Sequence, residues 1–147
     1  MSRLVAVTAF VLLAATATTP EAAIRTEFRA AAKAGDLTRF DIALNRAHKL
    51  IETMKLGARR NEFRRAIFAA EDLSRVWHFA RSDPNGMFYD EERLPFFYDH
   101  VVSHFPDYAR FINDFRVVDK SGLPEYPTLE TREFLLRKAE NTAPASP

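Results

Sequence analysis

The sequence predicts an all-α fold, a single-domain bundle of five or six short helices that follows a cleaved signal peptide. Apolar side chains recur at steps of three and four residues along most of the chain, which is the period of one helix face. No segment alternates apolar and polar residues convincingly, and the four glycines are too few for a turn-rich β fold. The 147 residues, 47% of them apolar, suffice for one domain with one core.

The first residues, 1–17, have the pattern of a Sec-type signal peptide. Arg3 is the only charge before Glu21, and the apolar run "LVAVTAFVLLAATA" ends in small residues that signal peptidase accepts. The run is shorter than the roughly 20 residues that cross a bilayer, so an uncleaved anchor is the weaker alternative. We expect cleavage after Ala17, export to the periplasm or the medium, and no stable membrane span afterwards.

Composition excludes several kinds of site. The chain has no cysteine, which excludes thiol catalysis, cysteine-ligated zinc, iron–sulfur clusters and covalently attached haem. Residues 18–81 hold 13 basic and 8 acidic side chains, whereas residues 82–147 hold 7 and 12. The simpler interpretation is attraction between the two halves; the alternative is a basic surface for an anionic partner. The expected mature chain, residues 18–147, has 20 basic and 20 acidic side chains, and this zero net charge together with expected export argues against a nucleic acid.

Two helices are predicted at the start of the mature chain. Thr19 offers a capping hydroxyl before Pro20, and Gly35 ends the first helix. Asp36 caps the second helix, which Gly57 is expected to close. The second helix has the clearest periodicity in the chain, in the stripe Phe40, Leu44, Ala47, Ile51 and Met54.

A third helix is predicted from about Arg60 to Arg81. Its main apolar stripe consists of Phe63, Ile67, Ala70, Leu73 and Trp77. Further apolar side chains widen that stripe, namely Phe68, Val76 and Phe79. This helix should therefore be central, with neighbours on more than one side. The sequence "DPNG" at residues 83–86 then predicts a type I turn.

Shorter helices are predicted in the second half. A fourth runs from Glu91 to His104, and a fifth starts after Pro106, which interrupts the backbone hydrogen bonds. A last helix spans Thr128–Glu140, with an apolar edge formed by Leu129, Leu136 and Ala139.

The remaining segments are expected to be irregular. We predict a loop over residues 119–127 and, in "RVVD" at residues 116–119, no more than a strand fragment. The helical domain is placed at residues 18–141, and residues 142–147 are expected to form a disordered tail.

A pair of histidines is one candidate site. His100 and His104 lie four residues apart on one helix face, where they could hold a metal ion or supply an axial ligand to haem. The chain lacks the stronger His-Glu-x-x-His pattern. Val101 and Phe105 should face the core, so half-exposed histidines beside a core are the simpler interpretation.

An arginine cluster is a second candidate. Arg59, Arg60, Arg64 and Arg65 could bind an anion such as phosphate. The simpler interpretation is that carboxylates pair with these guanidinium groups, the nearest in sequence being Glu62, Glu71 and Asp72.

Aromatic side chains around residues 77–102 give the best pointer to an interaction face. Three consecutive aromatics, Phe96, Phe97 and Tyr98, cannot all point inward from one helix. We predict an aromatic groove that binds a ligand or partner through Trp77, Phe88, Tyr89, Phe96, Phe97 and Tyr98.

The sequence therefore predicts a small exported binding or interaction protein. Its partner would be another protein or an apolar small ligand, held by burial of aromatic surface. The alternative is a periplasmic metal- or haem-binding bundle that uses His100 and His104. The chain has no Gly-x-Ser-x-Gly motif and no Gly-rich phosphate loop, so we expect no catalytic residues and no resident cofactor. Its sequence does not indicate an oligomeric state.

Overall fold

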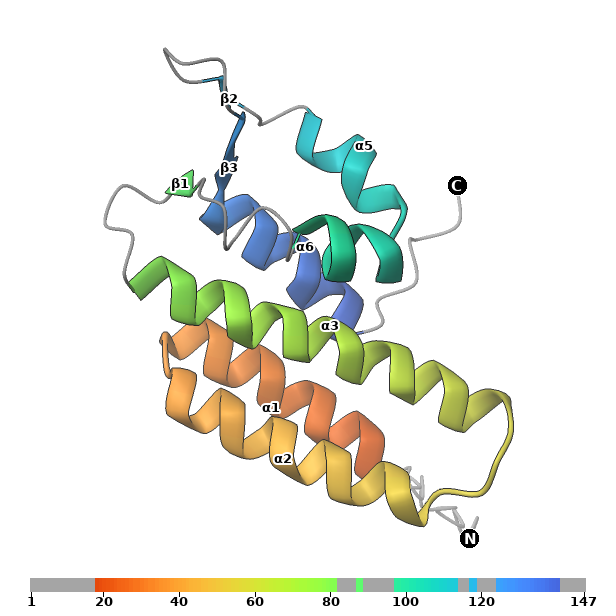
Figure 1. Ribbon diagram of the computed structural model, residues 1–147. Coiled ribbons are helices and arrows are strands. Elements are labelled where there is room, and N and C mark those ends of the chain that lie inside the picture. The colour runs from red at the N-terminus through yellow and green to blue at the C-terminus, as the bar shows by residue number, and fades with distance from the viewer. Residues whose placement is uncertain (1–17, 82–86, 89–96, 114–116, 119–123, 141–147) are drawn as a thin grey trace, which may run out of the picture.

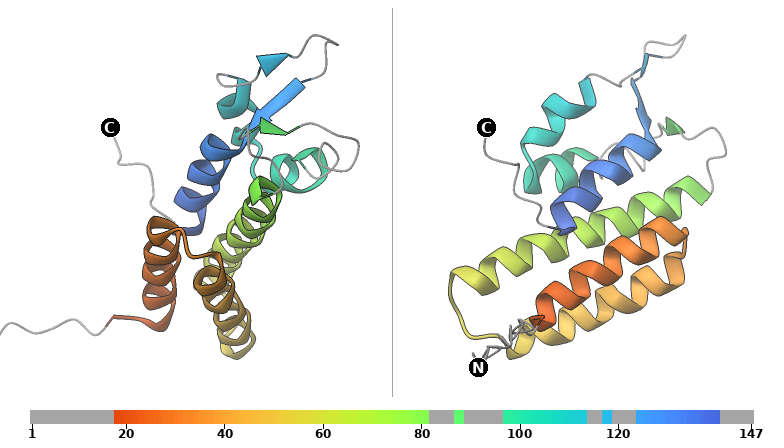
Figure 2. Two further views of the ribbon diagram at one scale, coloured as in Figure 1. Left: turned by 90° about the vertical axis from the view of Figure 1, so that its left-hand side faces the viewer. Right: turned by 180° about the vertical axis from the view of Figure 1, so that it is seen from behind.

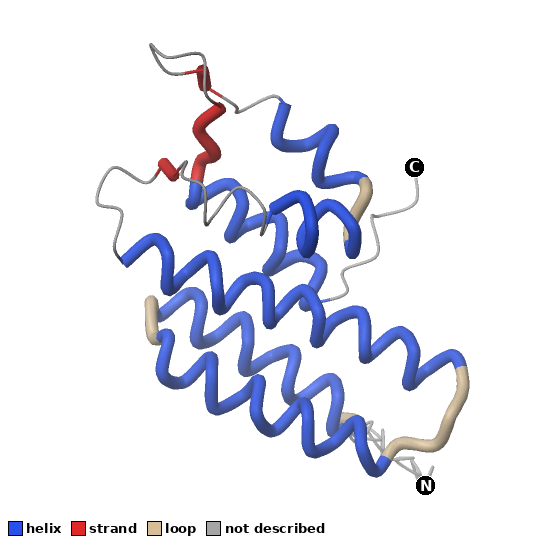
Figure 3. The backbone as a smooth tube through the Cα atoms, viewed as in Figure 1, coloured by secondary structure: helices blue, strands red, loops and turns tan. Residues whose placement is uncertain are grey.

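The computed structural model of the chain describes residues 18–81, 87–88, 97–113, 117–118 and 124–140. Within these ranges the chain is predominantly helical and contains six helices, as the periodicity predicts. They are α1 (Pro20–Ala34), α2 (Leu37–Thr53), α3 (Ala58–Arg81), the π-helix η1 (Phe97–Val102), α5 (Asp107–Asn113) and α6 (Thr128–Glu140) (Figure 1). Three short strands complete the described elements, namely β1 (Met87–Phe88), β2 (Val117–Val118) and β3 (Pro124–Pro127) (Figure 3).

The first two helices form a hairpin whose turn is set by side chains and one glycine. The Thr19 hydroxyl accepts a hydrogen bond from the Ala22 amide at 3.3 Å, which caps α1. Gly35 ends α1 with φ at +67°, a left-handed conformation that glycine adopts without steric cost. The Asp36 carboxylate then accepts from the Arg39 amide at 2.9 Å and caps α2. The predicted boundaries of α1 and the start of α2 are confirmed.

Four helices form a ring in which each packs against the next. The order around the ring is α1, α2, α3 and α6, and α6 closes it by packing against both α3 and α1 (Figure 2). The π-helix η1 packs on α3, and α5 packs on α6. The helix α3, which has 24 residues, is therefore central, as its wide apolar stripe predicts.

The interior of the ring is aromatic and alanine-rich. Phe28 of α1 meets Phe40 of α2 with ring centroids 5.0 Å apart, and Phe40 meets Trp77 of α3 at 5.8 Å. All five residues of the predicted main α3 stripe are buried. Alanines at buried positions of the same helices let the backbones approach closely, as Ala43 and Ala47 do on α2.

A second aromatic cluster joins the later helices to the ring. It consists of Phe105, Tyr108, Phe111 and Phe134, with the Phe134 ring centroid 5.0 to 6.4 Å from those of the other three. The Tyr108 hydroxyl and the Thr131 hydroxyl share a hydrogen bond of 2.9 Å in the buried contact between α5 and α6. This bond satisfies polar groups that would be costly to bury alone.

A small antiparallel sheet lies at one end of the helices. Its strand order is β1-β3-β2, with Phe88 opposite Tyr126 and Val117 opposite Glu125. The strand fragment predicted within residues 116–119 is β2. The prediction of a loop over residues 119–127 is wrong at its end, because β3 occupies Pro124–Pro127. Its hydrogen bonds come from β2, shortly before it in the sequence, and from β1, which lies far away in the sequence.

Two further expectations about helix ends and faces are corrected. The helix α2 ends at Thr53, where the Met54 amide bonds to the Ile51 carbonyl, so Gly57 lies in the connection rather than at the helix end. On α6 the fully or largely buried residues are Thr131, Phe134, Leu135 and Ala139, whereas the Leu129 side chain is 62% exposed. The predicted edge therefore mixes two faces, because α6 contacts helices on more than one side. The predicted turn at residues 83–86 and the tail at residues 142–147 lie outside the described residues.

Candidate functional site

A groove opens between α1, α3 and α6 near the carboxyl end of α3. We call it the Trp77 groove. It has a volume of about 340 Å³ and is lined by Arg29, Ala32, Lys33, Leu73, Trp77, Leu129, Arg132, Glu133 and Leu136. These positions recur at steps of three and four on each helix, so each helix presents one face to the groove. The volume lies at the lower end of the range for small-molecule sites.

The indole of Trp77 forms the floor of this groove. Its side chain is 6% exposed, and the Phe40 ring packs edge-on against it at 5.8 Å. The Arg132 guanidinium lies over the indole, 4.3 Å from the ring centroid. Such a stack is favourable because the negative face of the ring attracts the cation.

Apolar side chains line the walls of the groove. Leu73 lies one turn before Trp77 on α3, while Leu129 and Leu136 come from α6. Leu136 is partly buried against the core, whereas Leu129 is 62% exposed at the rim. An exposed leucine beside a buried tryptophan leaves apolar surface that a ligand can cover.

The charged side chains at the rim are unevenly paired. Arg29 donates two hydrogen bonds to the carboxylate of Glu140, at 3.0 and 2.9 Å. Within the described part of the chain, Arg132 has no hydrogen-bonded or ion-paired partner. Its guanidinium contacts the Trp77 ring instead. Burial lowers the pKa of the Arg132 guanidinium below its usual range. The groove thus holds a half-buried cation without a counter-ion from these residues.

The structure tests the predicted aromatic groove only in part. Of the six predicted residues, Trp77 lines a groove. Its neighbours there are leucines and arginines, which the aromatic pattern did not identify. The backbone places Phe88 in β1 and both Phe97 and Tyr98 in η1, while the positions of their side chains are not described. Tyr89 and Phe96 lie outside the described residues. Grouping these six residues in one site therefore stays a prediction.

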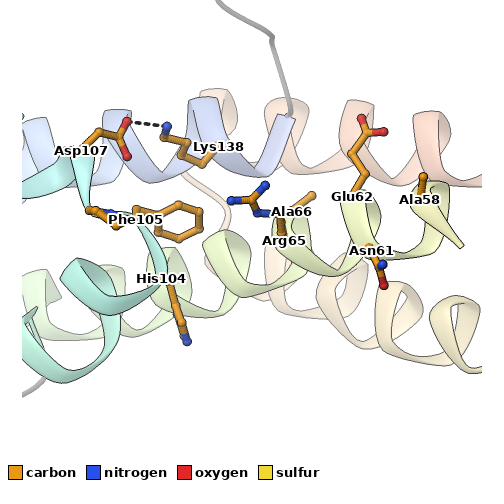
Figure 4. Close-up of a pocket in the computed structure, with 10 residues that line it drawn as sticks. Ala58, Asn61, Glu62, Arg65, Ala66, His104, Phe105, Asp107 and Lys138 are labelled. Atoms are coloured by element: carbon orange, nitrogen blue, oxygen red, sulfur yellow. Dashed lines mark hydrogen bonds and ion pairs between the residues drawn. The ribbon is translucent and has the colours of Figure 1, made fainter.

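A second cavity, which we call the Phe105 cavity, lies where α3, α6 and the segment before α5 meet. Its volume is about 400 Å³, and it is lined by Ala58, Asn61, Glu62, Arg65, Ala66, His104, Phe105, Pro106, Asp107 and Lys138. Acidic and basic side chains share its wall, and Lys138 contacts Asp107 at 2.5 Å (Figure 4). Its charges are therefore largely balanced, unlike those of the Trp77 groove.

The two candidate histidines lie close together, and one is held by a buried acid. His104 Nδ1 lies 3.2 Å from Asp72 Oδ2, and its ring stacks on Phe68 with centroids 4.9 Å apart. Burial raises the pKa of Asp72, although its contact with His104 acts in the opposite direction. The ring centroids of His100 and His104 are 6.3 Å apart. Among the residues that the structure describes, no three His, Asp or Glu side chains gather in a way that could hold a metal ion.

The other histidines also contact carboxylates. His48 lies 3.1 Å from Glu71, and His78 lies 3.2 Å from Asp41, which accepts a second hydrogen bond of 2.6 Å from the Ser74 hydroxyl. In a serine hydrolase the histidine stands between the serine and the acid. Here the acid stands between the other two, so this cluster does not activate Ser74.

The arginine cluster is divided among different contacts. Arg59 pairs with the buried Glu21 at 2.5 Å and lowers its pKa. Arg60 donates to the Ile51 carbonyl at 3.1 Å, and Arg65 lines the Phe105 cavity. Of the carboxylates nearest to this cluster in sequence, Glu62 contacts Arg25, Glu71 contacts His48 and Asp72 contacts His104. Arg64 is exposed on α3, and a shared anion site for the four guanidinium groups stays a prediction.

The described helices include none that is both long and apolar enough to cross a membrane. Comparison of the chain with protein-family models, with curated proteins and with solved structures finds no match.

Proposed function

We propose that this chain is a small ligand-binding protein that holds an apolar molecule in the Trp77 groove. One observation carries the proposal: a buried tryptophan lies beside an exposed leucine in a groove of about 340 Å³ between three helices. A small-molecule site typically has this size and an apolar lining with few polar groups. A stable protein partner would instead cover about 800 Å² of surface.

The energy of binding would come from apolar surface removed from water. Leu129 is 62% exposed, so an alkyl chain laid against it and Leu136 would remove water from both. Complete burial of a leucine side chain contributes about 1.5–3 kcal/mol. The floor is fixed before binding, because Trp77 is already packed against Phe40.

Tryptophan fluorescence tests this proposal directly. Trp77 is the single tryptophan of the chain, so its emission reports on the groove alone. We expect octanol to change the emission in a saturable way. The variant Leu129→Ser should weaken octanol binding about fivefold. The matched control is Leu56→Ser, since Leu56 is 84% exposed and lies in the connection before α3. An emission that octanol leaves unchanged would overturn the proposal.

Export remains part of the proposal, and the sequence of residues 1–17 supports it. The test is to express the full chain in a bacterium with a periplasm and to determine the mass of the product. We expect a periplasmic protein that begins at Thr18. A cytoplasmic product that retains residues 1–17 would overturn this part and leave the groove proposal untouched.

A metal or haem site at His100 and His104 is the second candidate function. The contact between His104 Nδ1 and Asp72 favours it, because a carboxylate often orients a metal-binding imidazole in this way. Elemental analysis and a visible spectrum of the purified protein are the measurements. This candidate predicts stoichiometric metal or haem that is lost in His104→Ala and retained in His48→Ala, where His48 pairs with Glu71 instead. A protein without metal or haem absorption would eliminate it.

A further inference from the structure

The chemistry of the bound molecule follows from the charges around the Trp77 groove. Arg132 is the central one, because its guanidinium lies 4.3 Å from the Trp77 ring centroid and also lines the groove. Arg132 is half-buried, so its guanidinium has lost part of its hydration. No carboxylate among the described residues replaces that hydration. A bound anion would replace it.

The other charged side chains at the rim also favour an anion. Lys33 lines the groove from the last turn of α1, and within the described part of the chain it has no ion-paired partner. Arg29 is already neutralised by Glu140, with N–O distances of 3.0 and 2.9 Å. Glu133 is the single acid among the lining residues. The rim therefore carries more positive than negative charge that is not already paired.

We infer that the Trp77 groove binds an amphipathic carboxylic acid, whose carboxylate contacts Arg132 and whose alkyl chain lies against Leu129 and Leu136. This inference rests on the proposed function, because it names the class of ligand for the same groove. The guanidinium presents a planar set of donors that matches a carboxylate. The contact with the Trp77 ring restrains that guanidinium before binding, which reduces the entropy lost on binding.

The size of the groove sets the size of the acid. At about 30 Å³ for each water-sized group, 340 Å³ holds on the order of ten non-hydrogen atoms. Octanoate has this size. Octanol has the same alkyl chain and no charge, so the pair separates the contribution of the headgroup from that of the chain.

The experiment titrates the full chain with octanoate and with octanol at pH 7 and follows Trp77 emission. We expect octanoate to bind at least about tenfold more tightly than octanol, since hydrogen bonds to charged groups are the strong ones. In Arg132→Gln we expect octanoate affinity to fall to that of octanol. Circular dichroism and urea denaturation of the same variant show whether it is folded. The control is Arg64→Gln, because Arg64 is exposed on the same helix as Trp77, about 20 Å away along its axis.

A second variant keeps the inference testable if Arg132→Gln fails to fold. Glu133→Gln removes the acid at the rim and leaves Arg132 and Trp77 in place. We expect it to tighten octanoate binding about twofold to threefold and to change octanol binding less. Higher salt should weaken octanoate binding and have little effect on octanol.

Each outcome decides between the two proposals. If neither probe changes the emission, the proposed function fails and the inference fails with it. If both probes bind with equal affinity, the groove binds apolar molecules and the inference alone is wrong. If octanoate is preferred but the preference survives in Arg132→Gln and is unaffected by Glu133→Gln, the carboxylate is bound elsewhere and the inference is also wrong.

Discussion

The Trp77 groove and the Phe105 cavity are similar in size and differ in how their charges are arranged. Both involve α3 and α6, with volumes of about 340 and 400 Å³. In the Phe105 cavity Lys138 lies 2.5 Å from Asp107, and further residues of both signs line the wall. In the groove Arg132 lies over an aromatic ring and has no acid beside it among the described residues. The cavity pairs Lys138 with an acid and its other cation, Arg65, is exposed to solvent, whereas the groove holds a half-buried cation without an acid among the described residues.

Replacing Trp77, the floor of the groove, should cause the largest loss of stability and of ligand binding. Trp77→Ala removes a side chain that is only 6% exposed, which should lower the free energy of unfolding by about 3–5 kcal/mol. It should also abolish octanol binding, which calorimetry can measure without the tryptophan. Urea denaturation followed by circular dichroism gives the stability.

The matched variant in the Phe105 cavity is Phe105→Ala. Phe105 is 7% exposed and packs on Phe134, so its loss should cost a similar free energy of unfolding. Octanol affinity at the groove should remain, because Phe105 does not line it. A cost below about 1 kcal/mol for Trp77→Ala would contradict its place as the floor of the groove.

The stack on Trp77 should contribute a smaller amount. Arg132→Met keeps an unbranched apolar side chain and removes the cation, so we expect a loss of about 1 kcal/mol in the free energy of unfolding. Urea denaturation of the variant with and without Trp77→Leu, which removes the ring, forms a double-mutant cycle. Purely additive losses would show that the cation and the ring do not interact.

Neutralising Asp107 should change stability less. The Asp107 and Lys138 side chains are 55% and 36% exposed, and exposed ion pairs contribute about 0.2–1 kcal/mol. Asp107→Asn should lower the free energy of unfolding within that range at low salt and by less at high salt. A loss that salt leaves unchanged would mean that Asp107 acts through packing instead.

The smallest effect is a pH dependence on the side of the Phe105 cavity, where His104 contacts Asp72. Burial raises the pKa of Asp72 in the folded state above its unfolded value. Its protonated form is therefore favoured by folding, and this stabilisation is present at low pH and lost as pH rises through the folded-state pKa. We expect the free energy of unfolding, relative to Asp72→Asn, to fall as pH increases from about 4.

The control for this pH dependence is Glu71→Gln. Glu71 contacts His48 at 3.1 Å in a similar pairing, but its side chain is 37% exposed. Urea denaturation across the pH series is carried out on this variant beside Asp72→Asn and the parent chain. Equal pH dependence for the two variants would show that burial of Asp72 is not the cause.

Local sequence signals predicted the helices well and the sheet poorly. Thr19, Gly35 and Asp36 act through neighbours three or four residues away, so the ends of α1 and the start of α2 could be predicted. The strand β3 depends on hydrogen bonds to β2, which shortly precedes it, and to β1, which lies far from it in the chain. Backbone groups in short strands carry no periodic side-chain signal, so the sequence indicated a loop there.

In the candidate site, too, the sequence predicted one residue and missed a partner that is distant in the chain. Trp77 was predicted to belong to a binding surface, but Arg132 was not, because the two lie 55 positions apart in the sequence. One signal was available in hindsight: Leu129, Arg132 and Leu136 share a face of α6, and that face mixes apolar groups with a cation. Periodicity alone does not say which face meets the core.

By itself the sequence determined the helical class, the central position of α3 and most helix boundaries. These depend on side chains one turn apart and on caps, which act within a few residues. The tertiary structure alone decided that α6 closes the ring against α1 and α3, that Arg132 lies on Trp77, and that His104 contacts Asp72. Each is a contact between segments distant in the chain, and its energy exists only once the helices have packed.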